Sequence, residues 1–127
     1  MEFVVIVAAA ALLQYSAFGY RAGMARGRFD VPAPAITGHP DFERRLRVQS
    51  NTLEQLVVFL PGLFMFAHYI HAPTAAGLGL VFITGRALYA RAYVNNPARR
   101  GPGFLLTIAA NLILVIGGLV GAGLRLL

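Results

Sequence analysis

The chain has 127 residues, of which 57% are hydrophobic and only 13% are charged. Soluble domains carry about twice that share of charge, so the composition excludes an ordinary soluble protein and indicates membrane spans of about 20 residues each. The absence of cysteine excludes disulfides, thiolate metal sites and a cysteine nucleophile, and the net charge of +6 comes from arginine without any lysine. In so apolar a chain we expect these arginines to anchor helix ends rather than to bind nucleic acid.

Four apolar segments predict an all-α integral membrane protein, a single four-helix bundle over residues 1–127 with spans at about 3–20, 44–71, 73–94 and 102–126. The first segment begins Met-Glu and is followed, not preceded, by positive charge, which favours an uncleaved span over a signal peptide. The connection over 21–42 contains VPAPAITGHP and should be irregular in that part. The joint at 71–73 is short, so the second and third helices should form an antiparallel hairpin. Asn95-Asn96-Pro97 predicts a turn before the fourth.

Positive charge is distributed unevenly between the connections. The first and third connections, with the adjoining helix ends, are rich in arginine, and the second has none. The positive-inside rule then predicts that the first and third connections are cytoplasmic and that both termini lie on the opposite side. The arginines concerned are Arg21, Arg26, Arg28, Arg44, Arg45, Arg47, Arg91, Arg99 and Arg100.

The segment ERRLRVQSNTLEQLVVFLPGLFMF, residues 43–66, runs from a charged cluster straight into an apolar span. On a helix, Arg47, Asn51 and Glu54 would fall within an arc of about 60°. Such groups at a membrane boundary are costly unless they pair, reach water or hold a ligand. This face is therefore either a binding site or a structural arrangement in which Glu54 pairs with Arg47 or with Arg86.

A second polar stripe lies near the end of the third segment. Arg86, Tyr89 and Tyr93 have the spacing i, i+3 and i+7, and the predicted topology places them on the same membrane side as Arg47. The tyrosines are candidates for interfacial aromatics, but their shared face with Arg86 favours a site. Arginines, an amide, a carboxylate and two phenols suit a small anionic ligand with carboxylates and amides, because arginine binds a carboxylate through two parallel hydrogen bonds.

Other features indicate packing rather than chemistry. The histidines are scattered without metal-ligand spacing, so we expect no metal site. Gly117 and Gly121 form a G-x-x-x-G pair that favours close helix approach. Thr107 and Asn111 are expected to hydrogen-bond towards the interior of the bundle.

The chain resembles the MAPEG family of membrane-associated proteins in eicosanoid and glutathione metabolism, in particular its microsomal glutathione transferase and leukotriene C4 synthase branch. The resemblance rests on FERRLRVQSNTLEQLVVFLPGLF, with the pattern Glu43, Arg47, Asn51 and Glu54, and on GRALYARAYVNNPARR, with the Arg-x-x-Tyr-x-x-x-Tyr pattern and a following arginine. Four spans, a long first connection and a tight second one agree with it over nearly the whole chain.

The resemblance implies a homotrimer that binds glutathione as co-substrate at each subunit interface. In this pattern Arg100 activates the thiol, although the adjacent Arg99 is an alternative, and Gln55 departs from the tyrosine of several members. The matching glutathione contacts are Arg47, Gln49, Asn51, Glu54, Arg86, Tyr89 and Tyr93, with Arg26 supplied by the neighbouring subunit.

These residues predict a membrane-bound glutathione transferase or peroxidase acting on lipophilic electrophiles or lipid hydroperoxides. The alternative is a non-catalytic protein of the same fold that binds or presents a lipid. The sequence does not distinguish glutathione from another small thiol, nor does it identify the lipophilic partner.

Overall fold

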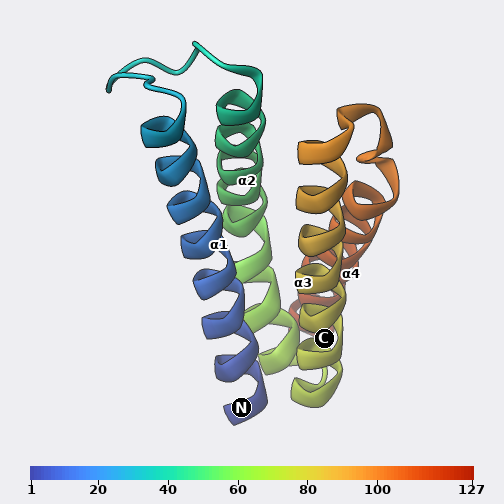
Figure 1. Cartoon of the computed structure of the whole chain (residues 1–127). Helices are drawn as coiled ribbons and strands as arrows, with labels where there is room; N and C mark the ends of the chain where they lie inside the picture. Colours follow the sequence, from blue (N-terminus) through green and yellow to red (C-terminus); the bar gives the residue numbers. More distant parts are fainter.

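The computed structural model describes all residues, 1–127, as four long helices and one short 3₁₀ turn. The helices are α1 (Glu2–Arg28), α2 (Pro40–Tyr69), α3 (Ala72–Asn95) and α4 (Gly101–Leu124), and the turn η1 (Pro97–Arg99) precedes α4. They run roughly side by side, with both termini at one end of the bundle and the connections α1–α2 and α3–α4 at the other (Figure 1). The all-α four-helix prediction is thus confirmed, and the arginine-rich connections share one end.

The helix boundaries follow from local sequence. α1 continues to Arg28, so the irregular connection is shorter than the expected 21–42, but its VPAPAITGHP part does lie outside helices up to His39. Two histidines begin the next helices: His39 Nδ1 accepts a hydrogen bond from the Asp41 amide at 3.2 Å, and His71 Nδ1 accepts one from the Thr74 amide at 3.3 Å. Each is followed closely by a proline in the first turn, where the missing N–H costs nothing. These two histidines therefore have structural roles.

The core of the bundle combines aromatic rings with small residues. Phe59 of α2 and Phe82 of α3 are fully buried and stack with their ring centroids 3.9 Å apart. Gly118 of α4 lies so close to α2 that an added Cβ would be 2.8 Å from the Met65 Cβ. In lipid, burying apolar surface adds little, so helices associate through such close packing and through polar contacts. The predicted glycine ridge of α4 does pack closely against α2.

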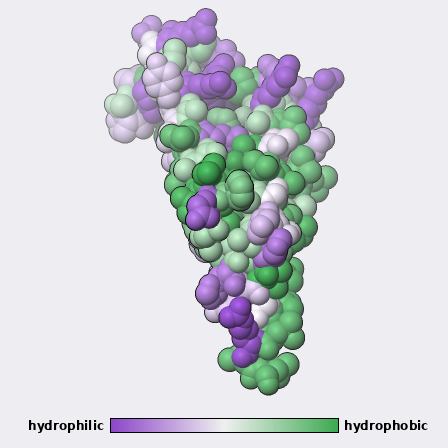
Figure 2. Space-filling view, turned by 90° about the horizontal axis from the view of Figure 1, so that it is seen from below, coloured by the Kyte–Doolittle hydropathy of each residue, from purple (hydrophilic) through white to green (hydrophobic).

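The outer surface is that of a membrane protein. Large apolar side chains such as Leu13 and Leu119 are 70% and 69% exposed. Viewed from below, hydrophobic residues cover much of the surface, and hydrophilic ones form separate groups (Figure 2). Three helices, α1, α2 and the helix that ends at Leu124, are long and apolar enough to cross a membrane. α3 is not among these three helices, so its crossing of a membrane stays a prediction.

Candidate functional site

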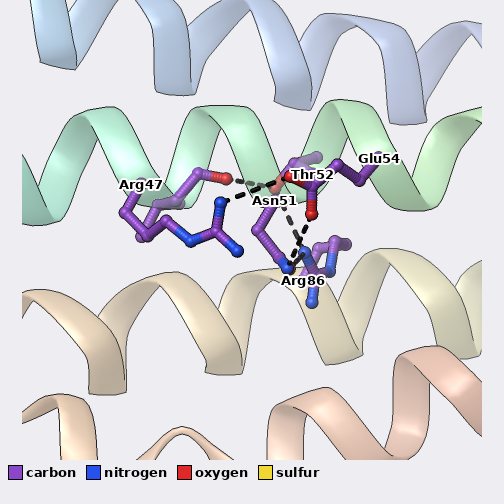
Figure 3. A network of polar contacts seen from close by, with 6 residues as sticks. Arg47, Asn51, Thr52, Glu54 and Arg86 are labelled. Atoms are coloured by element: carbon purple, nitrogen blue, oxygen red, sulfur yellow. Dashed lines mark hydrogen bonds and ion pairs between the residues drawn. The ribbon is translucent and has the colours of Figure 1, made fainter. Parts of the chain in front are cut away.

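A chain of polar contacts links α2 to α3 (Figure 3). A further hydrogen bond joins α3 to α4. We call this set of contacts the polar network, and it consists of Arg47, Asn51, Thr52, Glu54, Arg86 and Thr107. On α2, Arg47 Nη1 lies 3.3 Å from Glu54 Oε1, and Asn51 Nδ2 donates to Glu54 Oε2 at 3.4 Å. The predicted helical face therefore exists, and its charged ends pair within α2.

The position of Arg86 distinguishes this network from an ordinary surface cluster. The residue is 0% exposed, and no carboxylate pairs with it. Its Nη1 donates to Asn51 Oδ1 at 2.7 Å and lies 3.3 Å from Thr52 Oγ1, while its Nη2 has no partner. Of the two ion pairs considered for Glu54, the structure contains the one with Arg47. A buried guanidinium held by neutral groups, with one donor left over, is costly to maintain, and this makes the polar network the candidate functional site.

The fourth helix completes the support of Arg86. Arg86 Nε donates to Thr107 Oγ1 at 3.0 Å, and Thr107 in turn donates to the Gly103 carbonyl at 2.9 Å. Arg86 can reach Thr107 because α3 and α4 approach closely where Gly85 meets Gly103. A Cβ on Gly103 would lie 2.8 Å from the Gly85 carbonyl oxygen and against the Tyr89 backbone nitrogen. The expected inward hydrogen bond of Thr107 is confirmed, with Thr107 as the acceptor. The glycine crossing that brings Thr107 to Arg86 was not predicted.

Thr52 was also missed. It is fully buried beside Asn51, donates to the Val48 carbonyl at 2.7 Å and offers its oxygen to Arg86. A threonine in an apolar helix gives little signal, since its hydroxyl often bonds to its own helix. Only the packing of α3 against α2 gives it a second partner.

The aromatic side of the site follows Arg86 along α3. The Arg86 guanidinium carbon lies 4.3 Å from the centroid of the Tyr89 ring. Tyr89, itself buried, stacks on Tyr93 with the centroids 5.5 Å apart. The side chains of the predicted Arg86-Tyr89-Tyr93 stripe therefore contact one another in sequence along α3. The stripe begins at Arg86, which belongs to the polar network.

Three of the predicted site residues lie elsewhere in the subunit. Gln49 points to α1, where its Nε2 would be 2.9 Å from a Cβ on Gly19. Arg26 donates to the Ala35 carbonyl at 2.7 Å and covers the Phe42 ring. Arg100 is exposed and donates to the carbonyl of Pro97, in its own turn, at 2.8 Å. Within one subunit, the structure does not bring these three to the polar network.

Gln55, where several family members have tyrosine, has a visible role. Its Oε1 accepts a hydrogen bond from Asn111 Nδ2 at 3.1 Å, which joins α2 to α4 one residue beyond Glu54. The expected inward bond of Asn111 is therefore present. Asn111 Oδ1 has no partner.

The charged groups of this site suit an organic anion. No group of three or more histidine, cysteine, aspartate or glutamate side chains is close enough to hold a metal. Instead, the half-exposed Arg47 and Glu54 present one positive and one negative group at the mouth of the site. A ligand that carries both an ammonium and carboxylates could exchange this internal ion pair for pairs with itself.

Comparisons with known proteins show which family the chain resembles over most of its length. The family model described as the MAPEG family matches residues 4–120. Microsomal glutathione S-transferase 2 of Homo sapiens is 37% identical over 120 residues, which are 92% of this chain and 82% of that protein. An uncharacterized protein of Synechocystis is 46% identical over 115 residues, 91% of this chain and 84% of its own length. Leukotriene C4 synthase of Bos taurus is 37% identical over 76 residues, 60% of this chain and 51% of that protein.

Proposed function

The chain belongs to the MAPEG family, and we propose that it is a membrane-bound glutathione transferase. In this proposal it activates the glutathione thiol for attack on lipophilic electrophiles, and also for reduction of lipid hydroperoxides. The relatives named as glutathione transferases support the general activity. The observation that carries the proposal to specific residues is the buried Arg86, joined through Asn51 to the Arg47–Glu54 pair.

Each part of the polar network has a role in this proposal. Arg47 and Glu54 bind the carboxylate and ammonium ends of glutathione, because they are the half-exposed charged groups at the mouth. Asn51 binds a peptide amide, and Arg86 keeps its side chain oriented through the 2.7 Å bond to Oδ1. The family pattern implies a direct contact between Arg86 and glutathione. In this proposal the donor for that contact is Nη2, which has no partner in the subunit. Tyr89 and Tyr93 line the side of the ligand along α3.

A homotrimer would supply the residues that one subunit lacks. Gln49 lies about 200° around α2 from Arg47, so the two cannot serve one ligand within a subunit. Arg26 lies at the α1 side, on Phe42. The family resemblance assigns Arg26 to a neighbour's ligand, and we propose the same for Gln49, so the trimer remains part of the proposal.

Thiol activation is assigned to Arg100. A free thiol has a pKa of about 8.5, so only a few per cent is thiolate at neutral pH, and each unit of depression needs about 1.4 kcal/mol. Arg100 is exposed and held by one bond to its own turn, so it is free to swing over a bound sulfur. The thiolate sulfur then forms a bond to the electrophilic carbon as the leaving group departs. With a hydroperoxide, two glutathione thiols give up two electrons and two protons to yield disulfide, alcohol and water.

The test is thiol-dependent conjugation of an aromatic electrophile, and hydroperoxide reduction, by detergent-purified protein. We expect Arg47→Ala to weaken glutathione binding by tenfold to about a hundredfold, the loss of one charge-assisted contact of about 1.5–3 kcal/mol. Arg100→Ala should retain binding, measured as a glutathione-induced thermal shift, but raise the apparent pKa of the thiol, measured by thiolate absorbance.

Arg99→Ala is the matched control for Arg100→Ala, since the two arginines are adjacent and both exposed. If Arg99→Ala rather than Arg100→Ala shifted the thiolate titration, the role would move by one residue. Wild-type protein with neither activity nor a glutathione-induced shift would overturn the enzyme proposal and leave the lipid-binding alternative.

A further inference from the structure

A cavity of about 450 Å³ lies between α1, α2 and α3. Three arginines line it, one from each helix: Arg21 of α1, Arg45 of α2 and Arg91 of α3. Along α2, Arg45 lies about 200° from Arg47, and along α3, Arg91 lies about 140° from Arg86. None of the proposed glutathione contacts lines the cavity, although Val48 and Ala90 of its lining pack in one cluster with Tyr89. We call this cavity the α1–α3 groove.

The three arginines of the groove have no partner in the protein. None of them makes a side-chain hydrogen bond, a salt bridge or a cation–π contact, whereas Arg26, Arg44, Arg47, Arg86 and Arg100 each do. No acidic residue lines the groove. A second cavity continues from it past Arg21 and Arg45, adds Arg28, and has Asp41 as its one carboxylate. The groove therefore carries three positive charges, none of which forms a salt bridge in the subunit.

The rest of the lining is mostly apolar and small. Ala17 and Phe18 of α1 face Ala87 and Ala90 of α3 across the groove, with Val48 of α2 at its base. From Arg21 to Gln14, at its inner end, the groove follows α1 for seven residues, about 10 Å. The small side chains of α1 and α3 leave room in the groove for one hydrocarbon chain.

We propose that the α1–α3 groove binds an anionic phospholipid from the leaflet at the arginine-rich end of the bundle. The phosphate would lie between Arg21, Arg45 and Arg91, since arginine forks match phosphate oxygens and basic pockets between membrane helices bind lipid head groups. One acyl chain would run along Phe18, Ala87 and Ala90. The ends of α1, α2 and α3 that carry these arginines lie together at the end of the bundle opposite the termini (Figure 1). The charge and the apolar floor together favour a lipid over a soluble phosphate compound.

The experiment is native mass spectrometry of the full chain in detergent, titrated with phosphatidylglycerol or with phosphatidylcholine of the same acyl chains. We expect phosphatidylglycerol to bind more tightly. Arg45→Gln and Arg91→Gln should each weaken it about fivefold, the effect of one basic residue near an anionic head group. Arg99→Gln is the control at the same end of the bundle, because Arg99 is exposed and does not line the groove.

A second pair of variants tests the apolar part. Ala87→Phe should fill the groove and abolish the preference for phosphatidylglycerol, while Leu88→Phe, on the exposed neighbour that does not line the groove, should leave it unchanged. Excess inorganic phosphate should fail to displace the lipid, because the acyl chain contributes to binding. Full displacement by phosphate would show that the groove binds only the anionic head group.

Several outcomes would overturn the proposal. Equal binding of the two lipids, or an equal loss in Arg99→Gln, would show that only general surface charge acts. If Ala87→Phe dissociated an oligomer seen in the same spectra, the groove would be a subunit contact. None of these readouts involves glutathione, so they are independent of the proposed enzyme activity.

Discussion

The polar network and the α1–α3 groove both lie on α2 and α3, and they hold arginine in opposite ways. Arg86 is fully buried, bound to Asn51 and Thr107, and cannot turn without leaving those groups unpaired. Arg91, five residues later on the same helix, is exposed and unpartnered at the edge of a cavity. The hydrogen bonds of Arg86 hold the side chain of Asn51 in one orientation. The guanidinium of Arg91 has no partner in the subunit and is available to a ligand.

Burying the charge of Arg86 costs free energy. A buried charge is tolerated in a membrane bundle only when polar groups surround it, and here the groups are an amide and two hydroxyls rather than a carboxylate. Without a carboxylate partner, Arg86 keeps its positive charge uncompensated beside Tyr89. In our proposal a bound glutathione carboxylate supplies the missing negative charge nearby.

The largest effect that distinguishes the two regions should come from Arg86→Ala. We expect it to lower the free energy of unfolding by about 3 kcal/mol, because it leaves a cavity and removes the partner of buried Asn51 and Thr107. Denaturant unfolding in detergent measures this effect. The same variant should lose the glutathione-induced thermal shift, because Asn51 is no longer oriented. Unchanged stability would mean that the network does not hold the bundle together.

The next effect concerns the glycine crossing that brings α4 to Arg86. Gly103→Ala should lower the free energy of unfolding by about 2 kcal/mol, because the added methyl meets backbone atoms of α3 that cannot move aside. Gly101→Ala, two residues earlier with nothing within 4 Å of its Cβ, is the matched control and should be neutral or slightly stabilising. Equal effects in the two variants would argue against the close crossing.

The smallest effect is expected in the groove. In detergent without added lipid, Arg91→Ala should change the free energy of unfolding by less than about 0.5 kcal/mol, since its side chain makes no bond in the subunit. Added phosphatidylglycerol should then raise the melting temperature of the wild type more than that of the variant. A loss comparable to that of Arg86→Ala would erase the distinction between the two regions.

Part of the candidate site could be read from spacing alone. Arg47, Asn51 and Glu54 recur at one helical face, and so do Arg86, Tyr89 and Tyr93, because residues three, four and seven apart share a side of any α-helix. The structural roles expected for the histidines are present at His39 and His71, which begin helices. Thr52 and the Gly85–Gly103 crossing escaped notice, because a threonine or a glycine in an apolar helix has many ordinary uses.

The sequence by itself determined the class of the protein, the four helices and the end of the bundle that carries the charge, since composition, helical period and proline positions act locally along the chain. Only the tertiary structure decided which partner each arginine has. Glu54 pairs with Arg47 in its own helix, Arg86 turns to Asn51 and Thr107, and Arg21, Arg45 and Arg91 meet at one groove. The physical reason is that hydrogen bonds and ion pairs depend on distances of about 3 Å. Such distances between helices are set by how closely their small residues let them approach.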